Sequence, residues 1–163
     1  MGQSPLGHFF AFRPLGAAFR IDVAADADIE GTVWVKGSGR VHIGSGVRLL
    51  ARRAPIELRA HRGALIWIAR GAVIESGASI EATTSVHVGE GVRIEAFSKI
   101  IDNHFHRATG DRSQRPDGVP IVIGDEATVG LHAILLPGAS LGPRARVAPR
   151  HVVSFHVPAD RSA

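Results

Sequence analysis

The sequence predicts an all-β solenoid in which short parallel strands stack into triangular coils. Three observations support this fold class: branched aliphatic residues recur every six positions, small residues follow them at a fixed spacing, and 19 of the 163 residues are Gly. A helix repeats every 3.6 residues and cannot use a period of six, whereas a short strand followed by a tight turn can. We therefore expect strands and corners along most of the chain.

Residues 1–22 are the first expected element, a segment that caps the solenoid. Four Phe residues lie in it, and Pro5 and Pro14 interrupt it. This segment is too short and too broken for a signal peptide or a membrane span. Because the open end of a coil stack exposes unpaired strand edges, we expect the segment to cover that end or to pack on a neighbouring subunit.

Residues 23–157 are expected to form the β-helix domain, and residues 158–163 a short tail. The longest series of aliphatic residues at the six-residue spacing comprises Ile123, Val129, Leu135, Leu141, Val147 and Val153. Shorter series comprise Val23, Ile29, Val35, Val41 and Val47, then Ile68, Ile74 and Ile80, then Val88, Ile94 and Ile100. Three such hexads close a coil of about 18 residues, and stacked coils bury a ladder of aliphatic side chains.

Small residues occupy the fourth position after most of these aliphatics. They are Ala72, Ala78, Thr84, Ser98, Ala127, Ala133, Ala139 and Ala145. A tight corner needs small side chains and flexible backbone, so most of the Gly and Ala have a structural explanation. The six-residue spacing fails over residues 50–65, which we interpret as an irregular coil or a bulging corner.

A second interruption predicts a loop over residues 102–120. After Ile100 the spacing resumes only at Ile123, and the residues between are polar and rich in Arg. A solenoid does not need such an insertion for stability, and insertions of this kind tend to carry binding or catalysis.

The loop contains residues suited to general-base chemistry. Asp102 and His106 are four positions apart, and His104 supplies a second imidazole. Imidazole accepts protons near neutral pH, and a nearby carboxylate can fix its tautomer. The alternative is that two of the nine His residues simply fall in an exposed loop.

Three segments resemble the signature of the hexapeptide-repeat acyltransferases, in particular the sugar and maltose O-acetyltransferases and the surface-polysaccharide acetyltransferases. They are Ile101-Asp102-Asn103-His104-Phe105-His106, Val119-Pro120-Ile121-Val122-Ile123-Gly124-Asp125, and the stretch from Val129 to Leu136-Pro137-Gly138. The resemblance implies a left-handed parallel β-helix, although crossovers between parallel strands are generally right-handed. It also implies a homotrimer with active sites between subunits, acting in polysaccharide biosynthesis.

The resemblance implies direct transfer of an acetyl group from acetyl-CoA to a hydroxyl of a sugar-like acceptor, without a metal. His106 would be the base, Asp102 its partner or an acceptor contact, and His104 the reserve candidate. A backbone amide near the turn after Val129 would stabilise the oxyanion. For the donor, the implied contacts are Gly130, Ala133 and Ala148 beside the pantetheine arm and Arg144, Arg146 and Arg150 beside the phosphates. These residues have a structural alternative, as coil corners and as a solvated basic face.

Two other functions stay open at this point. A zinc-dependent carbonic anhydrase of the β-helix type would need three convergent imidazoles from among His87, His104, His106, His132, His151 and His156. A non-catalytic assembly protein would use only the rigid prism, and the loop argues against it.

Composition narrows the choice of partners and compartment. The net charge of +4 is scattered along the chain and no recognised nucleic-acid module is present, so we expect no nucleic-acid partner. No apolar run approaches the length of a membrane helix, and the chain has no Cys to suit an oxidising compartment. We expect a cytoplasmic protein without an integral membrane segment.

Overall fold

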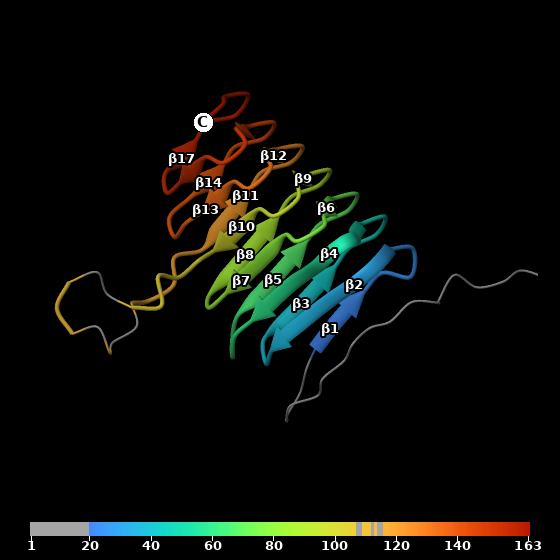
Figure 1. Cartoon of the computed structure of the whole chain (residues 1–163), viewed down its shortest axis with the longest axis horizontal. Helices are drawn as coiled ribbons and strands as arrows, with labels where there is room; N and C mark the ends of the chain where they lie inside the picture. The colour runs from blue at the N-terminus through green and yellow to red at the C-terminus, as the bar shows by residue number, and fades with distance from the viewer. Residues whose placement is uncertain (1–19, 107–108, 112, 114–115) are drawn as a thin grey trace, which may run out of the picture.

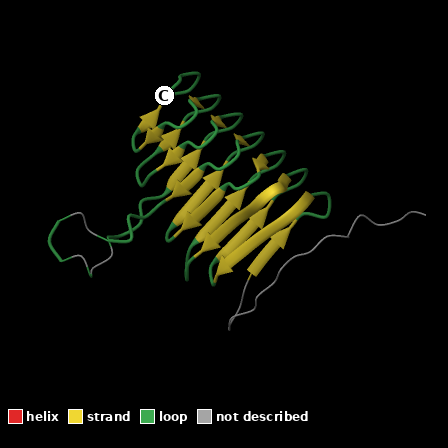
Figure 2. Ribbon diagram, viewed as in Figure 1, coloured by secondary structure: helices red, strands yellow, loops and turns green. Residues whose placement is uncertain are grey.

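The computed structural model describes residues 20–106, 109–111, 113 and 116–163, and in this part of the chain every regular element is a β-strand. The strands stack into a three-sided prism from which one loop projects (Figures 1 and 2). Almost all of the expected N-terminal cap lies outside the described residues. The first strand begins at Arg20, just before the expected start of the domain at residue 23.

Parallel pairing between successive coils builds the three faces of the prism. Face 1 consists of β1 (Arg20–Val23), β3 (Arg40–Ile43), β5 (Leu65–Ile68), β8 (Ser85–Val88), β11 (Ile121–Ile123), β14 (Ser140–Leu141) and β17 (His156–Val157). Face 2 consists of the first halves of β2 (Asp28–Gly37) and β4 (Arg48–Ala60), with β6 (Val73–Glu75), β9 (Arg93–Ile94), β12 (Thr128–Val129) and β15 (Arg146–Val147). Face 3 consists of the second halves of β2 and β4, with β7 (Ser79–Ala82), β10 (Lys99–Ile101), β13 (Ile134–Leu135) and β16 (Val152–Val153).

The strands β2 and β4 each run around the corner between faces 2 and 3. Their pairing shifts there, because Gly31 lies opposite Ala51 whereas Val33 lies opposite Ile56. Four residues of β4, 52–55, therefore stand against one residue of β2, which is a β-bulge. This bulge is the irregularity expected over residues 50–65, and regular pairing resumes at Ile56.

The six-residue spacing predicted the interior of the prism correctly. On each face the aliphatic residues stand directly above one another, and on face 3 this ladder is Val35, Leu58, Ile80, Ile100, Leu135 and Val153. From Leu58 onward every member of that ladder is completely buried. Burying one such side chain contributes about 1.5–3 kcal/mol, so the ladders dominate the stability of the fold.

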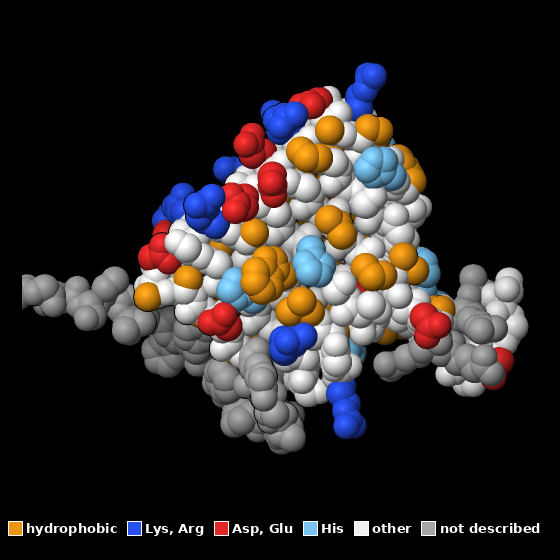
Figure 3. Space-filling view, turned by 180° about the vertical axis from the view of Figure 1, so that it is seen from behind, with side chains coloured by type: hydrophobic (Ala, Val, Ile, Leu, Met, Phe, Trp, Pro, Cys, Tyr) orange, Lys and Arg blue, Asp and Glu red, His pale blue; other side chains and the backbone are white. Residues whose placement is uncertain are grey.

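The outer surface of the prism has regions of charged side chains and regions of hydrophobic and His side chains. Ion pairs join neighbouring coils, as between Arg70 and Glu90 at 2.7 Å. On face 1 the His42 imidazole contacts the Asp22 carboxylate at 2.8 Å and stacks on the Trp67 ring at a centroid distance of 3.8 Å. In the view from behind, hydrophobic and His side chains lie in the middle of the surface, most charged side chains gather along one edge, and a few lie in its lower part (Figure 3). None of the described residues belongs to a helix long and apolar enough to cross a membrane.

Candidate active site

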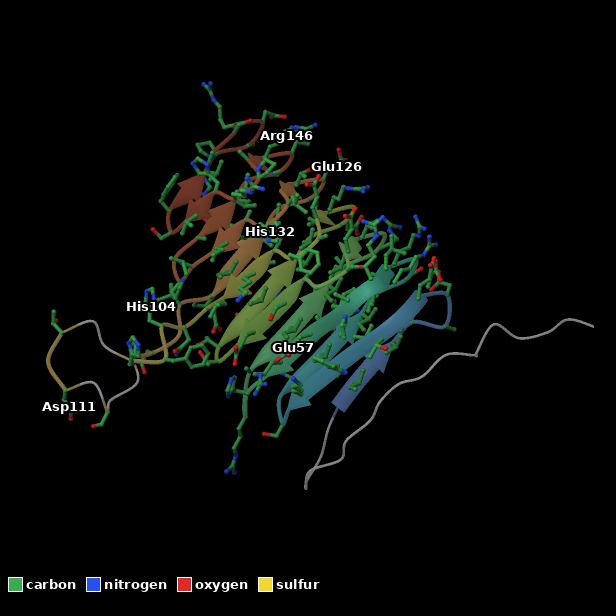
Figure 4. The ribbon with its side chains drawn as sticks, viewed as in Figure 1. Glu57, His104, Asp111, Glu126, His132 and Arg146 are labelled. Carbon is green, nitrogen blue, oxygen red and sulfur yellow. The ribbon has the colours of Figure 1, made fainter. Side chains whose placement is uncertain are left out.

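The inserted loop connects face 3 to face 1 and is closed at its base. It leaves the prism after Ile101, the last residue of β10, and returns before Ile121 in β11. The Val119 amide donates to the Asp102 carbonyl oxygen at 2.8 Å, and the Asn103 side-chain amide donates to the Pro116 carbonyl oxygen at 3.1 Å. These bonds form a narrow neck, with His104 at the prism end and Asp111 at the far end of the loop (Figure 4).

Asp102 anchors this neck to the coil below. Its carboxylate is completely buried and accepts hydrogen bonds from the Thr83 amide at 2.7 Å, the Thr83 hydroxyl at 2.9 Å and the Thr84 amide at 2.7 Å. Thr83 and Thr84 form the corner between β7 and β8. Hydrogen bonds from several donors compensate for burying a carboxylate. The bonds seen at the Asp102 carboxylate therefore lead to the prism, and none leads to His104 or His106 among the described residues.

Gly118 lets the returning strand of the loop lie close to this anchor. A Cβ atom at residue 118 would overlap the hydroxyl groups of both Thr83 and Thr84, and would come within 3.3 Å of the Asp102 carbonyl oxygen. A larger residue would therefore push the neck away from the prism.

Asn103 shapes the backbone between the two loop histidines, a role that we did not predict from the sequence. It is 5% exposed, and its side-chain oxygen accepts a hydrogen bond from the Phe105 amide. Phe105 has a φ of 59°, a left-handed conformation that is rare without Gly. An Asn that bonds the backbone two residues ahead is a known turn pattern, and this is the signal that sequence reasoning had available.

The two candidate bases are exposed and face solvent on either side of Phe105. The His106 amide donates to the His104 carbonyl oxygen at 2.7 Å, which completes a tight turn. Within the described residues, neither imidazole takes part in a hydrogen bond to another side chain. Both rings are therefore accessible to an acceptor hydroxyl.

The residues expected to line the donor lie at another edge of the prism, the corner between faces 2 and 3. Gly130 is buried there, and a Cβ atom on it would come within 2.6 Å of the Val147 carbonyl oxygen and 2.7 Å of the Pro149 nitrogen. Ala148 lies directly above and is exposed, so the pair forms a column without bulky side chains. The Ala133 methyl group is completely buried in the core and does not face this column.

The three candidate Arg residues are spread over two edges and one face. Arg144 lies at the corner between faces 1 and 2 and forms a bidentate pair with Asp160, at 2.6 and 2.9 Å. These hydrogen bonds raise the pKa of Arg144 and lower that of Asp160. Arg146 is exposed on face 2, while Arg150 is at the donor corner and its amide donates to the Leu131 carbonyl oxygen at 2.8 Å. Arg150 is therefore the candidate Arg that shares the corner with Gly130 and Ala148.

An aromatic pair also lies at this corner, made by Phe97, which the sequence did not single out, and His132, which it offered only as a zinc ligand. The rings of Phe97 and His132 stack with a centroid distance of 5.2 Å and an interplanar angle of 13°. Both residues have positive φ values, of 57°, and Phe97 is 42% exposed. The repeat spacing is the signal for this pair. Gly77, Phe97 and His132 occupy the same corner position in three successive coils. Beside them, Leu131 is another exposed apolar side chain.

The amides of the turn after Val129 already have acceptors within the protein. Those of residues 130, 132 and 133 donate to backbone carbonyl oxygens, and the Leu131 amide donates to the Glu95 carboxylate at 2.8 Å. An oxyanion donor at this turn therefore requires one of these bonds to break. The Leu131 bond is the one made to a side chain, which can rotate away.

The two candidate regions are on opposite edges of face 3. The histidine loop follows β10 at the edge shared with face 1, whereas Gly130 and Ala148 precede β13 and β16 at the edge shared with face 2. One chain therefore does not bring the loop imidazoles onto the small-residue column.

The six histidines considered for zinc are also dispersed. His87 and His156 lie on face 1, His132 and His151 are at the donor corner, and His104 and His106 are in the loop neck. The described part of a single chain contains no group of three His, Asp or Glu side chains arranged to hold a metal ion.

No protein-family model and no curated protein sequence matches this chain. Comparison with solved structures finds the polysialic acid O-acetyltransferase OatWY, with a TM-score of 0.58 and 14% identity over 85% of this chain and 76% of that one. A maltose O-acetyltransferase from Clostridium difficile 630 has a TM-score of 0.51 and 16% identity over 87% of this chain and 63% of that one. The polySia-specific acetyltransferase NeuO has a TM-score of 0.50 and 15% identity over 90% and 76%.

These likenesses define the class of structure. The chain is an all-β protein with the left-handed parallel β-helix fold, as in the O-acetyltransferases above. The fold that the resemblance in the sequence implied is thereby confirmed.

Proposed function

We propose that the protein is a CoA-dependent O-acetyltransferase that moves an acetyl group from acetyl-CoA to a hydroxyl of a sugar or saccharide-like acceptor. The observation that carries this proposal is the loop neck, which presents two exposed imidazoles on a turn that Asp102 ties to the prism and that Asn103 closes within the loop. A rigid presentation of a base suits catalysis, because a general base must lie within hydrogen-bond reach of the proton that it removes.

In the proposed reaction, His106 removes the proton from the acceptor hydroxyl as its oxygen attacks the thioester carbonyl carbon. The tetrahedral intermediate then collapses, the bond between carbon and sulfur breaks, and the CoA thiolate takes the proton from the imidazolium. The products are an acetyl ester and free CoA, and no covalent enzyme intermediate forms. His104 is the alternative base, on the other side of Phe105.

The donor corner supports acetyl-CoA as the second substrate. At this corner the small side chain of the exposed Ala148 leaves room for a narrow pantetheine arm, the buried Gly130 lets the coils beneath it pack closely, and Leu131 and Phe97 offer apolar contact beside it. The Arg150 guanidinium suits the phosphates at the end of such a ligand. Arg144 and Arg146, the other two candidates for the phosphates, lie in the same coil as Arg150 but at the corner between faces 1 and 2 and on face 2.

The separation of the two regions supports a homotrimer. Because the loop and the donor corner lie on opposite edges of face 3, an active site needs the loop of one subunit beside the donor corner of its neighbour. We expect sedimentation to give three chains per particle. A cytoplasmic location and a role in polysaccharide biosynthesis stay predictions.

Activity is tested by following thiol release from acetyl-CoA with a panel of sugars and amino alcohols. We expect His106→Ala to lose about 10²–10⁴-fold in kcat, the usual contribution of a general base, while CoA binding measured by calorimetry stays unchanged. The matched control is His104→Ala, on the other side of Phe105 in the same turn. A larger loss of kcat in His104→Ala than in His106→Ala would assign the base to His104. Absence of CoA binding by the wild-type protein would overturn the proposal. Metal analysis of protein purified without chelator tests the carbonic anhydrase alternative, which stoichiometric zinc would favour.

A further inference from the structure

His61 contacts the loop from outside it. The residue follows β4 at the corner between faces 3 and 1, and its Nε2 atom donates to the Glu81 carboxylate at 2.7 Å. Its ring lies against that of Phe105, with a centroid distance of 6.1 Å and an interplanar angle of 50°. Tilted aromatic pairs at such distances are favourable. His61 is thus a point where the prism touches the turn that carries the two candidate bases.

The backbone of His61 is also hydrogen-bonded, through both its amide and its carbonyl oxygen. Its amide donates to the Ala82 carbonyl oxygen and its carbonyl oxygen accepts from the Ala64 amide, both at 2.9 Å. The imidazole is about one-third exposed and cannot turn freely without losing the Glu81 bond. The Phe105 ring is therefore supported by a side chain fixed at both ends.

A chain of charged side chains extends this support across face 3. Glu81 lies 3.5 Å from the Arg59 guanidinium, which lies 3.1 Å from Glu57, and Glu57 accepts a hydrogen bond from Lys36 at 2.8 Å. Lys36, Arg59 and Glu81 are register partners on successive coils. Although burial opposes ionisation of Glu57, the hydrogen bonds from Lys36 and Arg59 outweigh it and lower the pKa of this carboxylate. The ion pairs keep Glu81 directed toward His61.

Phe105 transmits this support to the bases because it lies between them. Its positive φ and the bond from its amide to the Asn103 side chain set the direction of its ring. Without the His61 contact, the ring and the turn that carries it lose a support from the prism, and the flanking His104 and His106 can move with that turn.

We propose that His61 is a positioning residue for the catalytic loop: held by Glu81, its ring supports Phe105 and so orients the imidazoles of His104 and His106. The inference rests on the proposed acetyl transfer for its kinetic consequence. It assigns no contact between His61 and a substrate.

The kinetic test compares His61→Ala with His42→Ala in the full-length protein. His42 has the same kind of imidazole–carboxylate contact, 2.8 Å to Asp22, but lies on face 1 away from the loop. We expect His61→Ala to lower kcat about 10-fold with the KM for acetyl-CoA unchanged, since small misplacement of a catalytic group is costly, and His42→Ala to change neither. An equal loss in both variants, or a loss that appears in KM alone, would contradict positioning.

Two further variants separate the ring from the hydrogen bond. His61→Phe keeps a ring against Phe105 but cannot bond Glu81, whereas His61→Gln keeps a donor without a ring. We expect the kcat of His61→Phe to lie closer to that of the wild type than the kcat of His61→Gln does. In a double-mutant cycle, His61→Ala should have almost no effect once Phe105→Ala is present, because both changes remove the same contact. Additive losses would overturn the inference.

A readout independent of acetyl transfer keeps the inference testable if the proposed function fails. We expect the ¹³C-labelled imidazole resonances of His104 and His106 to shift and broaden in His61→Ala and to be unchanged in His42→Ala. Unchanged loop resonances in His61→Ala would refute positioning even in an active enzyme. Shifted resonances without acetyl transfer would support positioning and refute the function.

Discussion

The carboxylate of Asp102 is the most consequential single anchor in the structure, and its removal gives a quantitative prediction. In Asp102→Ala the Thr83 hydroxyl can turn toward solvent, but the amides of Thr83 and Thr84 lose their acceptor inside the corner. Thr83 is half-buried and Thr84 is exposed, so the loss is counted as two hydrogen bonds to a charged group, at about 1.5–3 kcal/mol each, or roughly 3–6 kcal/mol together. For a domain of typical stability, roughly 5–15 kcal/mol, this is a large fraction of the total.

Urea unfolding followed by circular dichroism measures this loss. With a typical slope of about 2 kcal/mol per M urea, the midpoint should fall by about 1.5–3 M. Asp102→Asn should cost less, because the amide keeps one oxygen for Thr83 and presents its NH₂ group to the Thr84 amide. The matched control is Asp125→Ala, since Asp125 is exposed and accepts a single bond from the Glu90 amide at 2.9 Å. We expect that control to shift the midpoint by less than about 0.5 M.

The same variants distinguish an anchor from a catalytic partner. If Asp102 acted by orienting an imidazole, Asp102→Asn would lose kcat while the unfolding midpoint stayed near that of the wild type. Equal midpoints for Asp102→Ala and Asp125→Ala would also refute the anchoring role. An anchor instead couples the two measurements, so that activity and stability fall together.

Two further predictions concern the prism. Gly130→Ala introduces a Cβ atom within 2.6–2.9 Å of the Val147, Ala148 and Pro149 backbone, so the coils must move apart; we expect a loss of about 1–3 kcal/mol by urea unfolding together with weaker CoA binding by calorimetry. A normal unfolding midpoint in this variant would contradict the tight corner. Because the pKa of Glu57 in the folded chain lies below its ordinary value of 4.5, its ionised form stabilises the protein above about pH 4.5, and this contribution disappears as the pH falls through the lower folded value. Urea midpoints measured from pH 7 to pH 3 should therefore fall less in Glu57→Gln than in the wild type, and parallel curves would refute this.

Much of the fold could be read from local spacing. The inward position of Ile80, Ile100 and Leu135 follows from the six-residue period, because each hexad repeats the same strand and corner. Their stacking in one ladder crosses a two-residue slip and the inserted loop, and the strand register decides it. The bulge at residues 52–55 is where a coil gains residues, and the sequence located it without showing that β4 continues through it.

The candidate site was predictable only in part. The loop and its histidines were visible as an interruption of the period, whereas the role of Asn103 depends on a backbone turn at Phe105 that the period does not describe. The stack of Phe97 on His132 joins residues in successive coils, and the extra loop residues between those coils hide their common corner position in the sequence.

The sequence by itself determined that the chain is a stacked β-solenoid with one polar loop containing imidazoles, because inward side chains repeat with the geometry of a single coil. Only the tertiary structure decided what the loop residues contact. The Asp102 carboxylate binds Thr83 and Thr84, which belong to the previous coil and reach it through stacking, and His61 meets Phe105 for the same reason. Stacking brings together residues that are distant in the chain, and a local period cannot specify which side chains then meet.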